Sequence, residues 1–249
     1  MKKFLFSLLC FGALNLNAEI FLELDFLASK IKEEENVKFD EKSSLRADFT
    51  IQSFNINNNN GSVGLFRFGA SDWESDFTTS NNITGKIKEE WSDFDLMLGY
   101  GYNLSNKDIV DKEIGNGMNI LIGLNHQNYK QRIDVAITKD SFLFGTQTIS
   151  GWRELTIKTN ALKLGINGFT ILHNNIYLNY DIYLKHYLDD NRNYGSNNKD
   201  GKTKFEASLG AGYKFGGNKN GVYVGIKAAY LNNLMGKGLR YGLTCGYKF

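Results

Sequence analysis

The stretch GKGLRYGLTCGYKF, residues 236–249, alternates between two kinds of residue. The apolar and aromatic set is Leu239, Tyr241, Leu243, Cys245, Tyr247 and Phe249. The small or polar set between them is Arg240, Gly242, Thr244, Gly246 and Lys248. A period of two residues puts the two sets on opposite faces of a β-strand. The chain therefore ends in a strand with one apolar face and one polar face.

The same alternation recurs along the whole chain. Six further segments show it: residues 19–28, 45–53, 94–104, 175–188, 204–215 and 221–231. The composition suits long strands, because the chain has no Pro, which would remove a donor from a strand ladder, but 26 Gly, 18 Phe and 13 Tyr. A mean hydropathy of −0.35 does not exclude a membrane protein, since only alternate residues of a barrel strand meet lipid.

The first residues, MKKFLFSLLCFGALNLNA, have the layout of a secretory signal peptide: a Lys pair, an apolar run and a small residue at Ala18. We expect cleavage after Ala18, which leaves one domain over residues 19–249. A lipoprotein anchor at Cys10 is disfavoured, because Leu9 stands where a small residue is needed. Cys245 is then the single cysteine, so no disulfide or Cys-based metal site is expected, and the net charge of +2 does not suggest nucleic acid as a partner.

The fold class predicted from these patterns is all-β, a closed antiparallel transmembrane β-barrel. No apolar run after the signal reaches the roughly 20 residues of a membrane-spanning helix. Short turns near residues 57–61, 172–175 and 216–221 alternate with long polar stretches at 29–43, 71–90 and 188–202, which we assign to the periplasm and the outside. The expected strands are ten: 19–28, 44–56, 62–70, 91–104, 117–137, 145–171, 175–187, 203–215, 221–231 and 238–249.

Two features leave alternatives open. Residues 139–152, KDSFLFGTQTISGW, fit one outer loop or an extra hairpin, which would make twelve strands. The apolar parity slips between Ile157 and Leu162, from which we infer a bulge near Asn160. A soluble β-sandwich with one wet face is the competing fold, because such a sheet shows the same alternation.

The last strand resembles the C-terminal signal that bacterial outer-membrane barrels present to their assembly machinery. The residues that carry the resemblance are Tyr241, Leu243, Tyr247 and Phe249. It implies a Gram-negative outer membrane as the location. The expected partners are outer-membrane lipid, lipopolysaccharide and the barrel-assembly machinery, together with an unknown ligand outside the cell. We expect a monomer.

Polar residues on the second face of the strands would line the barrel interior. The predicted interior network is Glu23, Asp25, Arg46, Asp48, Asp95, Asp181, Lys185, Glu206, Lys227 and Arg240, with Lys158 and Lys163 on the same face. Charges enclosed in a membrane protein are normally paired. A barrel of about eight strands is filled by its own side chains, whereas one of sixteen or more encloses an open channel. Ten strands with interior charges of both signs therefore predict a plugged interior.

A candidate catalytic group lies after the third and seventh expected strands. The segment ASDWESDF contains Asp72 and Asp76, and KHYLDDNRNY contains His186, Asp189 and Asp190. This layout resembles the omptins, ten-stranded outer-membrane endopeptidases that hold an Asp pair opposite an Asp and His pair. The resemblance implies a water activated by His186 as base and cleavage of basic peptides. The acids are four residues apart instead of two, and His186 precedes its acids, so the catalytic motif departs from the family pattern.

The function expected from the sequence is that of an integral outer-membrane surface protein. Its barrel would serve as an anchor without a wide channel, and its outer loops would contact a partner. An omptin-like endopeptidase and a narrow ion-conducting pore are the alternatives. We expect no metal and no cofactor, apart from a dependence of the activity on lipopolysaccharide. The acidic run KEEEN at 32–36 is read as a solvated loop, with a divalent cation that bridges lipopolysaccharide as the alternative.

Overall fold

The structure, a computed structural model, is built almost entirely of β-strands. It describes residues 19–30, 37–40, 43–57, 60–79, 83–103, 116–141, 145–172, 175–188, 202–216, 221–233 and 236–249. The strands are β1 (Glu19–Lys30), β2 (Val37–Phe39), β3 (Ser43–Asn57), β4 (Asn60–Thr79), β5 (Ile83–Asn103), β6 (Asn116–Ser141), β7 (Gly145–Ile171), β8 (Ile176–Tyr187), β9 (Thr203–Phe215), β10 (Gly221–Asn233) and β11 (Gly236–Lys248). No helix in the described part of the chain is long and apolar enough to cross a membrane.

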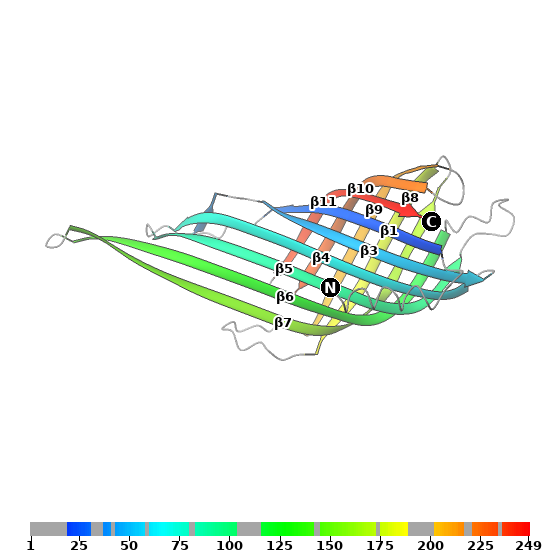
Figure 1. Cartoon of the computed structure of the whole chain (residues 1–249), viewed down its shortest axis with the longest axis horizontal. Helices are drawn as coiled ribbons and strands as arrows, with labels where there is room; N and C mark the ends of the chain where they lie inside the picture. The colour runs from blue at the N-terminus through cyan, green and yellow to red at the C-terminus, as the bar shows by residue number, and fades with distance from the viewer. Residues whose placement is uncertain are drawn as a thin grey trace.

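Ten of these strands form a closed antiparallel barrel (Figure 1). Each strand pairs with its neighbours in the sequence, and β1 closes the circuit by pairing with β11. The eleventh strand, β2, lies outside this circuit and pairs only with the outer end of β4. The predicted ten-stranded barrel is confirmed. The twelve-strand alternative is wrong, because Ser141 pairs with Gly145 across the tip of one continuous β6–β7 hairpin.

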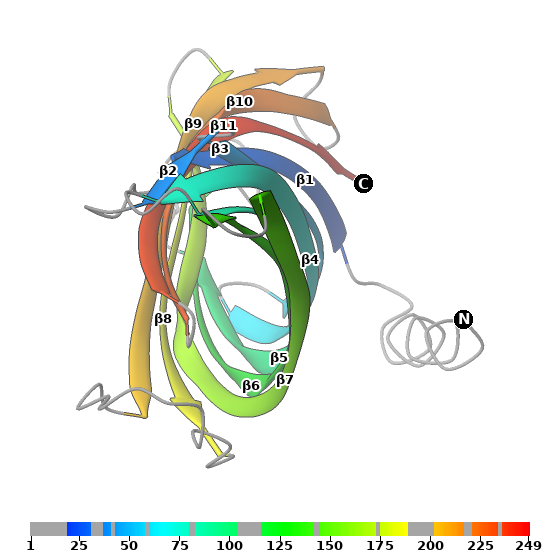
Figure 2. The ribbon, with the colours of Figure 1, turned by 90° about the vertical axis from the view of Figure 1, so that its left-hand side faces the viewer.

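The strands have two very different lengths. Strands β8 to β11 have 12 or 13 residues, whereas β4 to β7 have 20 to 27. A tilted strand crosses a membrane in about 9–11 residues, so the long strands continue well beyond it. Figure 1 shows β5, β6 and β7 running past the ends of the short strands, and Figure 2 looks onto the barrel from that side. We call the part of β4 to β7 beyond the lipid band, residues 71–79, 83–92, 127–141 and 145–160, the outer extension.

The outer extension corrects the predicted loop at residues 71–90, most of which belongs to β4 and β5. The prediction failed because the outer face of these segments carries charged residues in place of lipid-facing apolar ones. The alternation of apolar and polar residues that marks the other strands is therefore weak in this part of the sequence. The other predicted outer loop, 188–202, lies almost wholly outside the described residues, as does the expected signal peptide.

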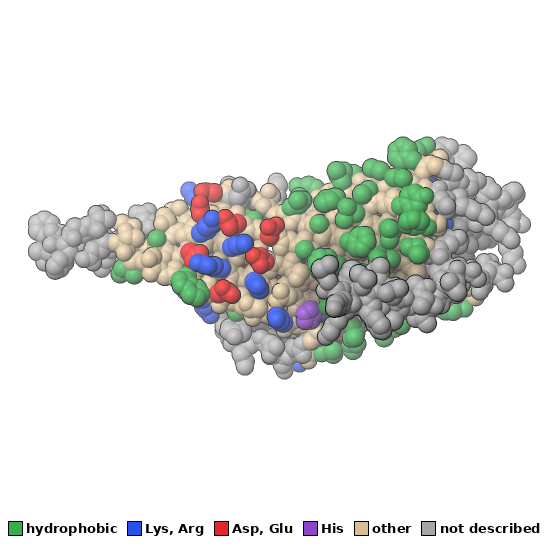
Figure 3. All heavy atoms as spheres, in the orientation of Figure 1, with side chains coloured by type: hydrophobic (Ala, Val, Ile, Leu, Met, Phe, Trp, Pro, Cys, Tyr) green, Lys and Arg blue, Asp and Glu red, His purple; other side chains and the backbone are tan. Residues whose placement is uncertain are grey.

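The barrel exterior carries an apolar band that ends abruptly (Figure 3). On β5 the exposed side chains pass from Leu98, Leu96 and Phe94 to Glu90 and then Lys88. Cross-strand rows show the same boundary: Phe49, Phe68, Phe94 and His126 lie in one row, and Leu45, Asp72, Glu90 and Lys130 lie in a row further out. An apolar band of this kind is the lipid-facing surface of a transmembrane barrel.

This boundary also explains why the apolar residues of β7 change from one face to the other between Ile157 and Leu162. The predicted bulge near Asn160 is wrong. The β6–β7 register is unbroken from Asn116 opposite Thr170 to Ser141 opposite Gly145. Leu162 and Leu164 face lipid, whereas Leu155 and Ile157 lie on the inner face of the outer extension. The parity of apolar residues changes because the outer face passes from lipid to water near Asn160.

Candidate functional site

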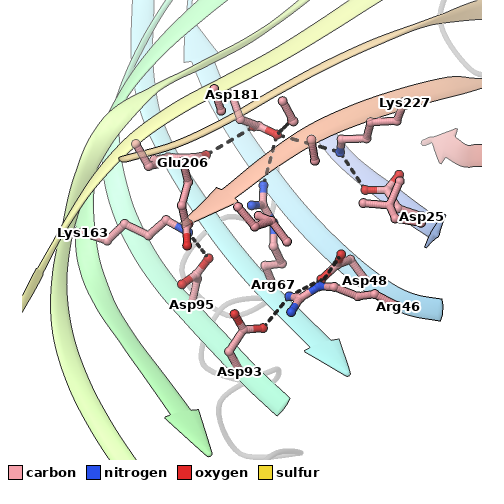
Figure 4. A pocket seen from close by; sticks show the side chains of 16 residues that line it. Asp25, Arg46, Asp48, Arg67, Asp93, Asp95, Lys163, Asp181, Glu206 and Lys227 are labelled. Carbon is pink, nitrogen blue, oxygen red and sulfur yellow. Dashed lines mark hydrogen bonds and ion pairs between the residues drawn. The ribbon is translucent and has the colours of Figure 1, made fainter. Parts of the chain in front are cut away.

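Three ionic groups fill the barrel interior. The outermost is centred on Arg46, which is 3% exposed. Its Nη2 donates to Asp48 Oδ1 at 2.5 Å and to Asp93 Oδ1 at 2.6 Å (Figure 4). Gly69, on β4 opposite Asp48, leaves the space for this guanidinium, since a Cβ there would lie 1.9 Å from Arg46 Nη2.

The second group is centred on Lys227 of β10. Its Nζ donates to Glu23 Oε1 at 2.6 Å and to Asp25 Oδ2 at 2.7 Å, and lies 3.8 Å from Asp181 Oδ2. Asp181 is also 3.3 Å from Arg67 Nη2. A single ammonium group therefore faces three carboxylates, which come from β1 and β8 on either side of the barrel.

The third group is a chain of alternating charge across β5, β7, β8 and β9. Lys163 Nζ donates to Asp95 Oδ2 at 2.7 Å and lies 3.0 Å from Glu206 Oε2. Lys185, fully buried, donates to the other oxygen of the Glu206 carboxylate. Enclosed charges cost little only when each has a partner of opposite sign, and this chain provides those partners.

The periplasmic half of the interior is closed by aromatic rings and apolar packing. Phe21, Phe169, Tyr177 and Tyr223 meet with ring centroids 4.9–5.6 Å apart. Apolar side chains fill the space beside them: Val63, Leu65, Met97 and Leu121 are each at most 2% exposed and pack with Tyr183. The cavity left among the ionic groups measures about 40 Å³, which is room for a water or two and not for a permeant solute.

The structure places every residue of the predicted interior network inside the barrel. Glu23, Asp25, Arg46, Asp48, Asp95, Lys185, Glu206 and Lys227 are buried, and Asp181 and Arg240 are partly buried. Lys158 was expected with them, but its side chain is exposed on the outer face of β7, beyond the lipid boundary. Asp93 and Arg67 were missed, although Asp93 shares the inward parity of the predicted Asp95 on β5.

The predicted catalytic residues are not brought together. Asp72 and Asp76 on β4 and His186 on β8 are exposed on the outside of the barrel wall. Their strands are separated by β5, β6 and β7 on one side. His186 shares the parity of Ile182 and Leu184, which face lipid, and its Nδ1 lies 2.9 Å from Thr203 Oγ1. The facing pairs that the omptin resemblance implied are therefore absent from the described residues, while Asp189 and Asp190 lie outside them.

The four residues of the expected assembly signal all face outward. Tyr241, Leu243, Tyr247 and Phe249 are 37–63% exposed. The rings of Tyr247 and Phe249 contact each other at 4.6 Å between centroids, and the Phe249 backbone N–H donates to the Ile20 carbonyl at 2.9 Å. The closing strand thus presents an aromatic edge on the periplasmic rim of the apolar band.

The outer face of the extension is covered by charged side chains of both signs (Figure 3). Lys86 is 2.5 Å from Glu74, Lys88 is 2.9 Å from Glu90, and Arg132 is 3.1 Å from Asp134. The hydrogen bond and charge of Glu74 raise the pKa of Lys86, and those of Lys88 lower the pKa of Glu90. Such exposed pairs add little stability, but they make this face soluble.

The inner face of the extension is apolar and aromatic. Phe39 of β2 packs on Trp73 and Phe77 of β4, with ring centroids 5.4 and 6.4 Å apart. Lower on this face the Tyr129 hydroxyl donates to Glu89 Oε1 at 2.7 Å, and burial beside that carboxylate raises the pKa of Tyr129. This face was not predicted, because residues 71–90 were expected to form an outer loop.

Near its tip the extension carries a hollow of about 600 Å³ lined by residues of β4 to β7. Trp152, 69% exposed, forms part of this hollow, and the Arg132 guanidinium lies 5.6 Å from its ring centroid. From Thr146 to Thr159, β7 pairs with β6 on one side only. Its other edge pairs with no described strand there, because the pairing of β7 with β8 begins at Ala161.

No protein-family model and no curated protein matches the chain in sequence. Solved structures that resemble it are outer-membrane barrels. The translocator domain of autotransporter NalP from Neisseria meningitidis shares 16% identity over 93% of this chain and 87% of that chain, with a TM-score of 0.43. Ail, the attachment invasion locus protein of Yersinia pestis, shares 16% over 93% and 99%, with a TM-score of 0.35.

The outer membrane protease OmpT from Escherichia coli shares 11% identity over 93% of this chain and 95% of that chain, with a TM-score of 0.35. Identities this low concern the fold alone. The barrel assignment rests on the strand pairing and the apolar band described above.

Proposed function

We propose that the protein is an outer-membrane surface protein whose barrel is a closed anchor and whose outer extension binds a partner outside the cell. The observation that carries the proposal is the contrast between the two halves of the molecule. Among the described residues, the barrel interior is filled by charged side chains and aromatic rings, with a cavity of about 40 Å³ between the ionic groups. The strands β4 to β7 nevertheless continue far beyond the lipid band.

The outer extension has the features of a recognition surface. Its framework is a hydrogen-bonded sheet, so a partner would meet a largely preformed surface and little entropy would be lost on binding. An exposed Trp at a hollow is a frequent anchor residue of interfaces. The unpaired edge of β7 offers backbone donors and acceptors to an added strand.

The experiment compares surface binding by the full chain with that of a shortened hairpin. In the variant, residues 134–152 are replaced by an Asn-Gly turn between Ile133 and Arg153, which are paired in the sheet. A Gram-negative host displaying either protein is applied to a panel of immobilised extracellular glycoproteins and glycans. We expect both proteins to insert as heat-resistant barrels and only the full chain to bind, with Trp152→Ala weakening the same interaction.

Conductance in planar lipid bilayers tests the anchor half of the proposal. The refolded full chain should give no porin-sized current steps, because a layer of charged side chains and a layer of aromatic rings both lie across the barrel interior. Regular current steps would support the pore alternative, and unchanged binding by the shortened hairpin would exclude the outer extension as the binding surface.

A further inference from the structure

The barrel mouth holds a guanidinium group that forms no ion pair with any described carboxylate. Arg240 of β11 points into the interior, and no carboxylate among the described residues lies within 4 Å of it. Its buried Nη1 has no hydrogen-bond partner among the described residues. A buried donor without a partner is costly, and a guanidinium stays charged at all physiological pH values.

A second guanidinium lies beside it. Arg46 donates from Nε to Asp48 and from Nη2 to Asp48 and Asp93, while its buried Nη1 also lacks a partner in the part of the chain that the structure describes. Both guanidinium groups contact the Trp91 indole, at 4.8 Å for Arg46 and 5.5 Å for Arg240. Three strands, β3, β5 and β11, thus bring two cations with free buried donors to one aromatic ring.

We propose that Arg46, Arg240 and Trp91 form a binding site for a tetrahedral oxyanion, a phosphate or sulfate group, at the outer mouth of the barrel. A planar carboxylate pairs with one guanidinium through both its oxygens, as Asp48 does with Arg46. A tetrahedral anion has oxygens in several directions and can accept from guanidinium groups that approach from different strands.

The surroundings fit an anion that enters from outside. Trp91 is half-buried and lies just beyond the lipid boundary on β5, so the site can be reached from the outer solution. On the periplasmic side, the Asp48 and Asp93 carboxylates hold Arg46 in place. This site does not depend on the outer extension binding a partner, and its test uses a different readout.

The test uses Trp91 as the only tryptophan, excited selectively over the tyrosines, in a refolded protein that carries Trp73→Phe and Trp152→Phe. Sodium phosphate is titrated against sodium chloride at equal ionic strength, and a sulfate titration follows. We expect a saturable change in Trp91 emission with both oxyanions and none with chloride. Arg240→Gln should abolish saturation and Arg240→Lys should weaken the affinity at least tenfold.

The control is Arg132→Gln, which removes an exposed arginine of the outer extension and leaves the mouth intact. It should bind phosphate like the parent protein. A second readout is thermal unfolding, because an anion that binds only the folded state raises the melting temperature. Phosphate should raise it for the parent and not for Arg240→Gln. A linear response in the parent, or equal saturation in Arg240→Gln, would overturn the proposal.

Discussion

Replacing Lys227 with Met should destabilise the barrel more than any single change of an exposed charge. The Lys227 ammonium is the shared cation of Glu23 and Asp25, at 2.6 and 2.7 Å, and lies near Asp181. All of these side chains lie inside the barrel, and Lys227 is only 5% exposed. Removing one partner of a buried ion pair leaves an uncompensated charge and costs about 3–5 kcal/mol. We expect a loss of this size in the free energy of unfolding.

The assay is equilibrium urea unfolding of the refolded protein in lipid vesicles, followed by tryptophan emission. Two controls separate charge from packing. Lys86→Met removes a cation from an exposed pair and should leave the urea midpoint unchanged. Adding Glu23→Gln and Asp25→Asn to Lys227→Met should recover most of the lost stability, because the carboxylates that were left unpaired are then neutral. A Lys227→Met protein as stable as the parent would refute the ion-pair account of the interior.

Three further predictions concern side chains outside the ionic core. His186→Ala should leave any cleavage of basic fluorogenic peptides unchanged, since the ring lies on the outer wall; turnover that disappears in this variant would restore the peptidase reading. Glu89→Gln should lower the pKa of Tyr129 toward that of a free tyrosine, measured by ultraviolet absorbance, and no shift would mean that burial alone sets it. Lys88 lowers the pKa of Glu90. The pair therefore stabilises the fold fully at pH values above the ordinary glutamate pKa, and this stabilisation is lost as the pH falls through the lowered pKa. Lys88→Gln should return the Glu90 pKa to its ordinary range in an NMR titration, and salt should weaken the effect in the parent protein.

Several properties of the site were readable from the sequence, and others were overlooked in it. The parity of residues 176–188 assigns Asp181 and Lys185 to one face and His186 to the other. That pattern already contradicted a catalytic His186 pointing across the barrel mouth. The partner of each inward charge was not readable, because Lys227 meets Glu23 at a separation of 204 residues.

The sequence by itself predicted ten strands, their antiparallel order and the inward face of most interior charges, although it placed Lys158 on the wrong face. These follow from a backbone whose side chains alternate with a period of two and from turns built of Asn and Gly, both of which are local properties. Only the tertiary structure decided where lipid ends, how far β4 to β7 extend, and that Arg46 and Arg240 meet at Trp91. Those features depend on the closure and register of the barrel, which bring together side chains that the chain itself keeps far apart.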